Sequence, residues 1–286
     1  MIRDFKLEDK NELIKLIKLV KQDFLITEEE ISECFDAKNY QIIVFDNGEK
    51  IQGFSCVKPW NNKKKADVLV YVVPNERRKG IGTLLYTQIM KQKYTLNFTF
   101  IVTQFRIGKE DVTPFYKSLG YQKWYGVHDL LYNGSAQPKS ELKIIAYEDR
   151  YFEQYAEGLR SSFYEMRKAH DFQPHICCEL SDEKRSEFLK NKEKIFLLLN
   201  NEKLIASAMV TNNGLLDDIF VTPFYQGKGY GKIITQFAIN KAISQGANRI
   251  ELNVVEWNEK ALKLYQSLGF SKIQTTHYYK LVKTEI

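Results

Sequence analysis

Two glycine-rich stretches of this chain have the composition of an anion-binding loop. Residues 77–82 read Arg-Arg-Lys-Gly-Ile-Gly, and residues 226–231 read Gln-Gly-Lys-Gly-Tyr-Gly. Each follows an apolar, strand-like run that ends in Val-x-Pro, and each precedes a helical pattern. Glycines let a backbone approach a ligand closely, and the first amides of a helix have no internal partners and attract negative charge. The second stretch, with Lys228 and Lys232, therefore predicts a site for a phosphate or pyrophosphate.

The spacing of the second stretch excludes two common phosphate-binding loops. A P-loop needs a glycine five residues before Gly231 and a Ser or Thr after Lys232, but the chain has Gln226 and Ile233 there. The dinucleotide fingerprint needs a third glycine, where the chain has Ile234. A third pattern, (Arg/Gln)-x-x-Gly-x-(Gly/Ala), fits both stretches.

The two stretches belong to a long internal repeat. Val72 before the first stretch and Val221 before the second are separated by 221 − 72 = 149 residues. The sequence Tyr-Lys-Ser-Leu-Gly-Tyr at 116–121 returns as Tyr-Gln-Ser-Leu-Gly-Phe at 265–270, and 265 − 116 is again 149. A constant offset across two motifs predicts two copies of one domain, each large enough for its own core. We expect an N-terminal domain at 1–133, a linker at 134–140 that is rich in turn residues, and a C-terminal domain at 141–286.

Hydrophobic periodicity predicts the same alternation of strands and helices in both copies. Strands are expected at 2–5, 42–45, 54–57, 68–73, 98–102, 142–146, 195–199, 204–210, 215–221 and 249–255. Helices are expected near 13–20, after Thr27, and at 83–93, 113–119, 232–244 and 259–268, with a long helical region at 149–190 that breaks near Gln173 and Pro174. A closing pair of strands is expected at 271–282.

The bulk composition is that of a soluble globular protein. The 286 residues are 44% hydrophobic and 27% charged, with a net charge of +6. No apolar run is long enough to span a membrane, and no signal peptide is recognisable. The four cysteines form no metal-like grouping, so we expect free thiols in the cytoplasm and no metal. The short run at 63–65 is a basic loop rather than a stripe with interleaved aromatics, so no nucleic-acid partner is expected.

On these motifs the chain resembles, twice over, the GNAT superfamily of acyl-CoA-dependent N-acyltransferases. The likeness is most specific in the second copy, where Asn258, Ala261, Leu264, Tyr265 and the Leu-Gly-Phe at 268–270 match the family's second motif. The resemblance implies an α/β (α+β) chain with two tandem GNAT folds. Each would have a mixed, mostly antiparallel central sheet flanked by helices. It also implies acetyl-CoA as co-substrate.

The resemblance also implies roles for individual residues. The strand before each loop would pair with pantetheine, and the loop would hold the pyrophosphate, while Asn258 would contact the cofactor or cap a helix. These cofactor-binding residues are Ile219, Phe220, Val221, Gln226, Gly227, Lys228, Gly229, Tyr230, Gly231, Lys232 and Asn258, with Val72, Arg78, Lys79, Gly80 and Gly82 in the first copy.

The motif match supports the general acid of the reaction better than the general base. Tyr265 matches the family's general acid, which would protonate the departing thiolate. Several members place a glutamate where this chain has Asn253. We expect Asp218 to act as the base instead, with Asp217, Glu251 and Glu256 as alternatives, and an unassisted attack through water is a further one. Strand alternation would send the two aspartates to opposite faces.

The two copies are not equally complete. The first copy keeps Tyr116 at the acid position, but has Lys109 where the second has Asn258, Gln104 where it has Asn253, and Pro114 inside the short helix. We therefore predict that the second copy is the catalyst. The first would be degenerate, structural or cofactor-binding.

The expected reaction is direct acetyl transfer to a primary amine of a small molecule or peptide. The alternative is a catalytically silent CoA-binding regulatory protein. Either could be a monomer or a homodimer. The resemblance implies that acceptor residues come from the helical region, which holds Phe163, Tyr164, Met166, Arg167, His170, Phe172 and His175, although aromatics in a helical region more often belong to the core.

Overall fold

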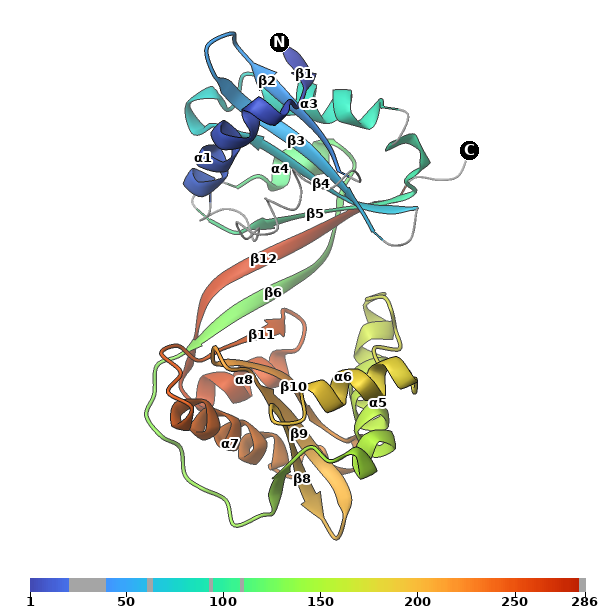
Figure 1. Ribbon diagram of the computed structural model, residues 1–286, viewed down its shortest axis with the longest axis vertical. Helices are drawn as coiled ribbons and strands as arrows, with labels where there is room; N and C mark the ends of the chain where they lie inside the picture. Colours follow the sequence, from blue (N-terminus) through green and yellow to red (C-terminus); the bar gives the residue numbers. More distant parts are fainter. Residues whose placement is uncertain (21–39, 61–63, 93–94, 109–110, 283–286) are drawn as a thin grey trace. The chain divides into compact units, whose positions relative to one another are not determined.

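The computed structural model describes residues 1–20, 40–60, 64–92, 95–108 and 111–282 (Figure 1). The chain divides into two compact units. Unit 1 comprises Met1–Gly126 together with Thr275–Ile286, and unit 2 comprises Val127–Gln274. Three expectations fall on residues outside the described ones. They are the helix after Thr27, the first residue of the basic run, Lys63, and Lys109, which stands at the position of Asn258.

Unit 1 is built around a sheet in the order β1-β2-β3-β4-β5-β12. Its strands are β1 (Ile2–Asp4), β2 (Gln41–Asp46), β3 (Ile51–Pro59), β4 (Lys65–Val72), β5 (Phe100–Arg106) and the last part of β12 (Phe270–Val282). Its described α-helices are α1 (Lys10–Val20), α3 (Ile81–Met90) and α4 (Thr113–Ser118). All neighbouring strands are antiparallel except β4 and β5, which run parallel.

Unit 2 repeats this arrangement in the order β7-β8-β9-β10-β11-β6. Its strands are β7 (Ile144–Ala146), β8 (Ile195–Asn200), β9 (Lys203–Val210), β10 (Leu215–Val221), β11 (Glu251–Val255) and part of β6 (Gln122–Tyr132). Its α-helices are α5 (Phe152–Ala169), α6 (Asp182–Lys190), α7 (Tyr230–Ser244) and α8 (Glu259–Ser267). Here β10 and β11 are the parallel pair.

The expected class, a mixed sheet between helices, is confirmed in both units. In unit 2, Ile234 of α7 and Tyr265 of α8 belong to one core cluster, and Tyr155 of α5 and Phe188 of α6 belong to another. Unit 1 is similarly divided, with α3 and α4 in one cluster and Leu13 of α1 in the other. The two core clusters of each unit lie on opposite faces of its sheet because neighbouring residues of a strand point to opposite sides.

The last strands of the two copies are exchanged between the units. β6 follows α4 in the sequence, yet residues 127–131 pair with β11 in unit 2. β12 follows α8, yet residues 276–282 pair with β5 in unit 1. The compact units therefore do not coincide with a division of the sequence at 134–140, although that segment is free of helix and strand. Its role as a linker stays a prediction.

The expected pair of closing strands at 271–282 is wrong. The structure has one uninterrupted strand, β12, from Phe270 to Val282. The segment lacks Gly, Pro, Asn and Asp, which supply most tight turns, so nothing in it folds the chain back. By contrast, the predicted break near Pro174 is confirmed, since α5 and α6 are separate and Ser181 caps α6 by accepting from the Lys184 amide.

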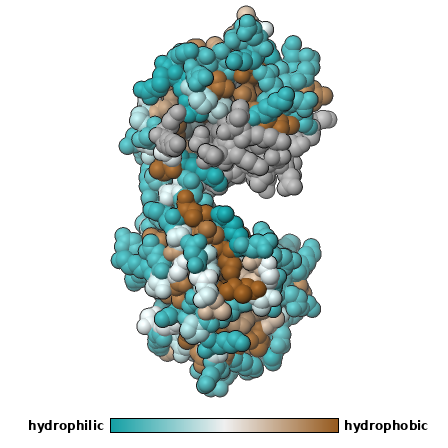
Figure 2. All heavy atoms as spheres, turned by 90° about the vertical axis from the view of Figure 1, so that its left-hand side faces the viewer, coloured by the Kyte–Doolittle hydropathy of each residue, from teal (hydrophilic) through white to brown (hydrophobic). Residues whose placement is uncertain are grey.

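Among the residues that the structure describes, every helix is too short or too polar to cross a lipid bilayer. On the face drawn in Figure 2, hydrophilic side chains surround smaller hydrophobic areas. Cys56, Cys177 and Cys178 are free thiols.

Candidate functional site

In each unit, the strand before the glycine loop separates from its parallel neighbour. β10 pairs with β11 only at Leu215 and Leu216, and β4 pairs with β5 only over Lys65 to Asp67. Beyond these residues β10 and β4 continue beside their antiparallel neighbours, and no strand of the described chain pairs with them on the other side. The edge that faces the parallel neighbour is therefore open for a ligand that pairs with backbone groups.

The hydrogen bonds of β10 show which groups face this open edge. The Thr222 amide donates to the carbonyl of Ile205 at 2.9 Å, so Thr222 and Phe220 face β9. Ile219 and Val221 must then face the other way, because backbone groups alternate along a strand. These residues are the ones expected to pair with a pantetheine arm.

A side-chain clasp occupies the carbonyl at the end of the strand. The Val221 carbonyl accepts from Gln226 Nε2 at 3.0 Å and from Ser162 Oγ at 3.1 Å. In unit 1 the Val72 carbonyl accepts from Arg77 Nε at 2.9 Å. Both clasps satisfy the acceptor and leave the N–H of the valine facing the open edge. This explains why the motif begins with Arg or Gln, a role that the sequence alone did not reveal.

The loop of unit 2 presents a row of amides at the start of α7. Gly227 and Gly229 have φ angles of 75° and 88°, in the left-handed region that favours glycine. Within the described chain, no carbonyl accepts from the amides of residues 227–231. Gly231 packs closely against α8 instead, because a Cβ there would lie 3.3 Å from Leu264 Cδ2 and the leucine would have to shift slightly. The result is a concave set of donors at a helix N-terminus, suited to a pyrophosphate.

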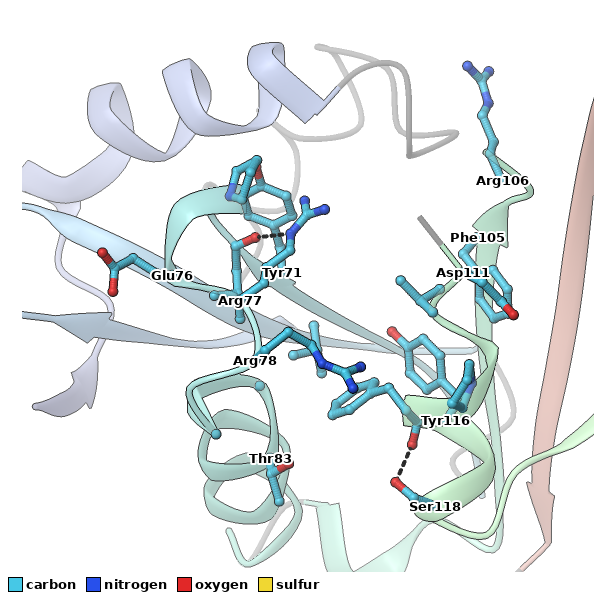
Figure 3. A pocket seen from close by; sticks show the side chains of 18 residues that line it. Tyr71, Glu76, Arg77, Arg78, Thr83, Phe105, Arg106, Asp111, Tyr116 and Ser118 are labelled. Atoms are coloured by element: carbon cyan, nitrogen blue, oxygen red, sulfur yellow. Dashed lines mark hydrogen bonds between the residues drawn. The ribbon is translucent and has the colours of Figure 1, made fainter. Parts of the chain in front are cut away.

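The loop of unit 1 has the same backbone with a different residue in one strained position. Gly80 has a φ of 83°, like Gly229. Arg78 has a φ of 66° and stands where unit 2 has Gly227. A left-handed conformation is unfavourable for a residue with a Cβ. In Figure 3 the Arg78 side chain extends from the loop into a cleft.

This cleft of unit 1 has a volume of about 770 Å³. It is lined by the end of β4, the loop, β5 and α4, including Val72, Arg78, Phe105 and Tyr116 (Figure 3). The ring of Tyr116 stacks on Phe105 with 5.4 Å between centroids, and burial raises the pKa of its hydroxyl. The first copy thus keeps a formed cavity beside its anion loop.

Tyr265 occupies the corresponding position of unit 2, on α8. It is buried against Phe270 in an edge-to-face contact with 6.0 Å between centroids. Burial raises the pKa of its hydroxyl, and the charge of Asp217 raises it further. Tyr265 is therefore protonated at neutral pH and able to donate.

A β-bulge separates the two aspartates of β10. The register shifts between Asp217 and Phe220, and Asp218 has a φ of 46°, a conformation that Asp tolerates better than most residues. The bulge leaves Asp217 exposed and Asp218 half-buried. Burial, with the charge of Asp217, raises the pKa of Asp218 to about 6, although Lys184 opposes the rise.

The two carboxylates share one neighbour and differ in the others. Both raise the pKa of Tyr155 on α5. Asp217 also raises the pKa of Tyr265, and Asp218 also raises the pKa values of the Cys177 and Cys178 thiols. In the described chain no cation lies within ion-pair distance of Asp218. A half-buried, unpaired carboxylate with a pKa near neutrality can accept a proton.

Two of the alternative bases are placed less favourably, since Asp217 is exposed and Glu251 forms an ion pair with Arg249. Asn253, at the position of the family's glutamate, is exposed. Asn258 caps α8, since its Oδ1 accepts from the Ala261 amide at 3.2 Å. That bond is the structural role expected for Asn258.

Trp257 was missed in the sequence. It lies directly before Asn258, and His170 stacks on it with 4.1 Å between ring centroids and 4° between planes. Phe172 meets the same indole at 6.2 Å, edge-on. The sequence offered one indication of its importance, namely that it directly precedes Asn258. These contacts join the segment after α5, expected to hold acceptor residues, to the turn that begins α8.

Two family models match the chain, one in each repeat. The acetyltransferase (GNAT) domain model matches residues 38–123, and the acetyltransferase (GNAT) family model matches residues 152–270. Together these matches cover more than half of the chain. The chain belongs to the GNAT acetyltransferase family. It carries two GNAT domains in tandem, as the repeat predicted.

Solved structures agree on the GNAT fold. A GCN5-related N-acetyltransferase from Sphaerobacter thermophilus aligns with a TM-score of 0.71 at 15% identity, over 100% of this chain and 96% of that one. A tandem GNAT protein from the clavulanic acid biosynthesis pathway aligns with a TM-score of 0.64 at 13% identity, over 100% and 99%. At such identities the likeness concerns the fold alone.

Curated relatives match over shorter segments. A thialysine N-epsilon-acetyltransferase from Sus scrofa is 38% identical over 65 residues, which are 23% of this chain and 38% of the relative. A [ribosomal protein bS18]-alanine N-acetyltransferase from Escherichia coli is 32% identical over 87 residues, 29% of this chain and 59% of the relative. The chain thus spans less than two thirds of the length of these GNAT relatives.

Proposed function

We propose that this protein is an N-acetyltransferase that moves an acetyl group from acetyl-CoA directly to a primary amine, and that the reaction takes place in unit 2. The observation that carries the proposal is the arrangement around β10. There an open strand edge, a row of free loop amides, a buried neutral tyrosine and a half-buried carboxylate occur within one unit.

Each part of unit 2 has a role in binding the co-substrate. Ile219 pairs with the pantetheine amides, and the amides of residues 227–231 hold the pyrophosphate. The N–H of Val221 donates to the thioester carbonyl and stabilises the oxyanion that forms there. Fixing both substrates beside one strand supplies much of the rate by proximity.

The acid and the base are two different residues on two different elements. The amine nitrogen attacks the carbonyl carbon, and its surplus proton passes to Asp218. The C–S bond breaks, and Tyr265 protonates the departing thiolate. The amine and the thiolate thus exchange protons with different groups, Asp218 and Tyr265. No Cys or Ser nucleophile is required.

The acceptor is a primary amine of a small molecule or peptide. Relatives carry the names thialysine N-epsilon-acetyltransferase, L-ornithine N5-acetyltransferase and [ribosomal protein bS18]-alanine N-acetyltransferase. Side-chain amines of basic amino acids and an alanine-terminated peptide are therefore the first acceptors to test.

A comparison of the two units favours a second cofactor site in unit 1, one that binds the cofactor but has no catalytic activity. Its cleft has the loop, Arg78 and Tyr116, but the 149-residue offset places Val68 and Leu69 where unit 2 has Asp217 and Asp218. We infer that unit 1 binds acetyl-CoA without turning it over. If unit 2 were silent as well, the chain would be a CoA-responsive regulatory protein.

The test is thiol release from acetyl-CoA in the presence of the amine panel, with the acetylated product identified by mass spectrometry. Calorimetric titration of acetyl-CoA into the wild type and into Gly229→Glu and Gly80→Glu variants assigns the sites. We expect turnover to vanish with Gly229→Glu and to persist with Gly80→Glu. Binding without turnover for every amine would favour the regulatory alternative, and no binding at all would refute both.

A further inference from the structure

The sheet of unit 1 carries a row of five aromatic side chains, which we call the aromatic stripe. The centroids of Trp60 and Phe100 are 6.2 Å apart, and those of Phe100 and Trp124 are 5.3 Å apart. Tyr125 follows at 4.9 Å from Trp124, and Tyr278 at 4.2 Å from Tyr125. All five residues are half-buried. The stripe thus joins segments that are far apart in the sequence into one partly exposed aromatic surface.

The stripe lies on the face of the sheet opposite α3 and α4. Tyr279 belongs to the core cluster of those two helices, so its neighbours Tyr278 and Lys280 point to the other face. Ile101 belongs to the same cluster, which places Phe100 on that other face as well. None of the five rings lines the cleft beside the glycine loop. The stripe is therefore separate from the proposed cofactor site of unit 1.

Two lysines lie against rings of the stripe. Lys65 Nζ is 5.7 Å from the centroid of Trp60 and 5.2 Å from that of Phe100. Lys280 Nζ is 5.4 Å from the ring centroid of Trp124. A lysine in such a contact keeps its positive charge. The segments that carry the rings, 58–60, 64–67, 100–102, 123–125 and 278–282, contain five lysines and one carboxylate, Asp67. The charge around the stripe is therefore predominantly positive.

The second repeat shows that the fold does not require these side chains. At the 149-residue offset, unit 2 has Met209, Gly214, Arg249 and Ile273 where unit 1 has Trp60, Lys65, Phe100 and Trp124. Because the last strands are exchanged, the positions of Tyr278 and Lys280 correspond to Asp129 and Leu131 in unit 2. The aromatic and basic character belongs to unit 1, and a packing requirement common to both units does not explain it.

We propose that the aromatic stripe is a binding surface for single-stranded nucleic acid. Its bases stack on the rings, while Lys65 and Lys280 contact its phosphates. A row of partly exposed rings suits a ligand with flat groups at short intervals, and the positive surroundings favour an anion. A single strand meets both requirements. An acidic peptide meets only the second, and the bases of a duplex are already stacked on one another.

This surface could not be recognised along the sequence. The short basic run that includes Lys65 has no aromatic residues within it, so it did not indicate a nucleic-acid partner. The tertiary structure supplies the missing rings, because it places Trp60 and Phe100 against Lys65. The inference goes beyond acetyl transfer and does not depend on it.

The experiment measures, by fluorescence anisotropy, the binding of a labelled oligothymidylate of about 12 nucleotides to the full chain. The comparison ligands are an abasic strand of equal length, which has the phosphates without the bases, the matching duplex, and polyglutamate. We expect each of them to bind at least about ten-fold more weakly than the single strand. Excess coenzyme A should leave the affinity for the oligothymidylate unchanged, because the stripe is separate from the glycine loops.

Two kinds of variant separate stacking from charge. Trp124→Ala should weaken binding of the oligothymidylate at least about five-fold, whereas Trp124→Phe should retain most of the affinity because it keeps a ring. Lys65→Met and Lys280→Met should each reduce the steepness of log K against log salt concentration by about 0.7. Ile273→Ala is the matched control in unit 2. Ile273 stands at the position of Trp124 and is 43% exposed, so its loss should leave the affinity unchanged.

Several outcomes would overturn the proposal. Binding of the abasic strand or of polyglutamate as tight as that of the oligothymidylate would show a general attraction of anions. Competition by coenzyme A would place the oligonucleotide at the glycine loops. An unchanged affinity in Trp124→Ala, or an unchanged salt dependence in both lysine variants, would exclude the stripe. The lysine variants leave every ring in place, so they decide the question even if the Trp124→Ala chain does not fold.

Discussion

The strand and loop of unit 1 and those of unit 2 have the same frame and differ in a few side chains. Both have an open strand edge, a clasped valine carbonyl and a left-handed glycine before the helix. At matched positions, unit 1 has Leu69 and Arg78 where unit 2 has Asp218 and Gly227. β4 also pairs with β3 in one uniform register, whereas β10 is bulged.

The comparison teaches that holding a cofactor and using it depend on different parts of the fold. The frame is made of backbone groups, which survive changes of side chain, so both copies keep it. Proton transfer needs a particular carboxylate in a particular setting. Unit 2 has Asp217 and Asp218 on the strand with the open edge, where unit 1 has Val68 and Leu69, and the bulge gives the two aspartates different surroundings.

The largest expected effect comes from the exchanged strand. Ending the chain after Gln274 removes the residues of β12 that pair with β5, together with the buried Tyr279. We expect the β5 amides to lose their protection from hydrogen exchange, although the deleted residues are far from β5 in the sequence. The amides of β9 and β10 should keep theirs. Unchanged protection in β5 would contradict the exchange.

The second prediction separates the two tyrosines. Tyr265→Phe should lower kcat roughly 100-fold or more, because a general acid contributes about 10²–10⁴. Tyr116→Phe should alter kcat less than about two-fold, because unit 1 is proposed to be silent. Steady-state thiol release measures both. Equal losses of kcat in the two variants would contradict the proposal that only unit 2 is catalytic.

The third prediction concerns Asp218. Its pKa of about 6 lies above the usual value for an aspartate, so the wild-type rate should fall about tenfold for each pH unit below 6. Asp218→Asn should lower the rate at pH 7.5 by about 100-fold and keep the left-handed backbone, which Asn tolerates. Asp217→Asn is the matched control, with a smaller expected loss.

The same substitution should alter stability with a defined sign. Because folding raises the pKa of Asp218, the folded state favours its protonated form, and that stability is lost as pH rises through about 6. Asp218→Asn should therefore raise the free energy of unfolding at pH 7.5, by about 1 kcal/mol after allowance for partial exposure. The gain should vanish below about pH 4. Urea titrations at the two pH values test it, and a loss of stability at pH 7.5 would count against burial as the cause.

The smallest expected effect is at Arg78. Arg78→Gly relieves a left-handed φ and should raise the free energy of unfolding of unit 1 by about 0.5–1 kcal/mol. It should also weaken coenzyme A binding to unit 1, because the guanidinium is lost from the cleft. Calorimetry in a Gly229→Glu background isolates that site. Stabilisation without any loss of affinity would show that Arg78 is only a tolerated residue.

Much of the architecture could be read from local patterns. The constant 149-residue offset predicted two copies, and periodicity placed strands such as β10 and helices such as α8 to within a few residues. The glycine loops were recognisable because a positive φ angle favours glycine at Gly229 and close packing favours a small residue at Gly231. The strand at 271–282 was misjudged, because a long strand without turn residues was read as a hairpin.

The sequence by itself determined the repeat, the anion loops and the position of Tyr265, because each depends on residues that are neighbours along the chain. Only the tertiary structure decided the exchange of β6 and β12 and the bulge that leaves Asp218 half-buried. It also decided that the loop lysine contacts Glu76 in unit 1 and Phe224 in unit 2. The exchanged strands and the bulge arise from pairing between distant strands. The partner of the lysine depends on how the loop backbone directs its side chain. Strand register and side-chain direction leave no periodic signal in a single sequence.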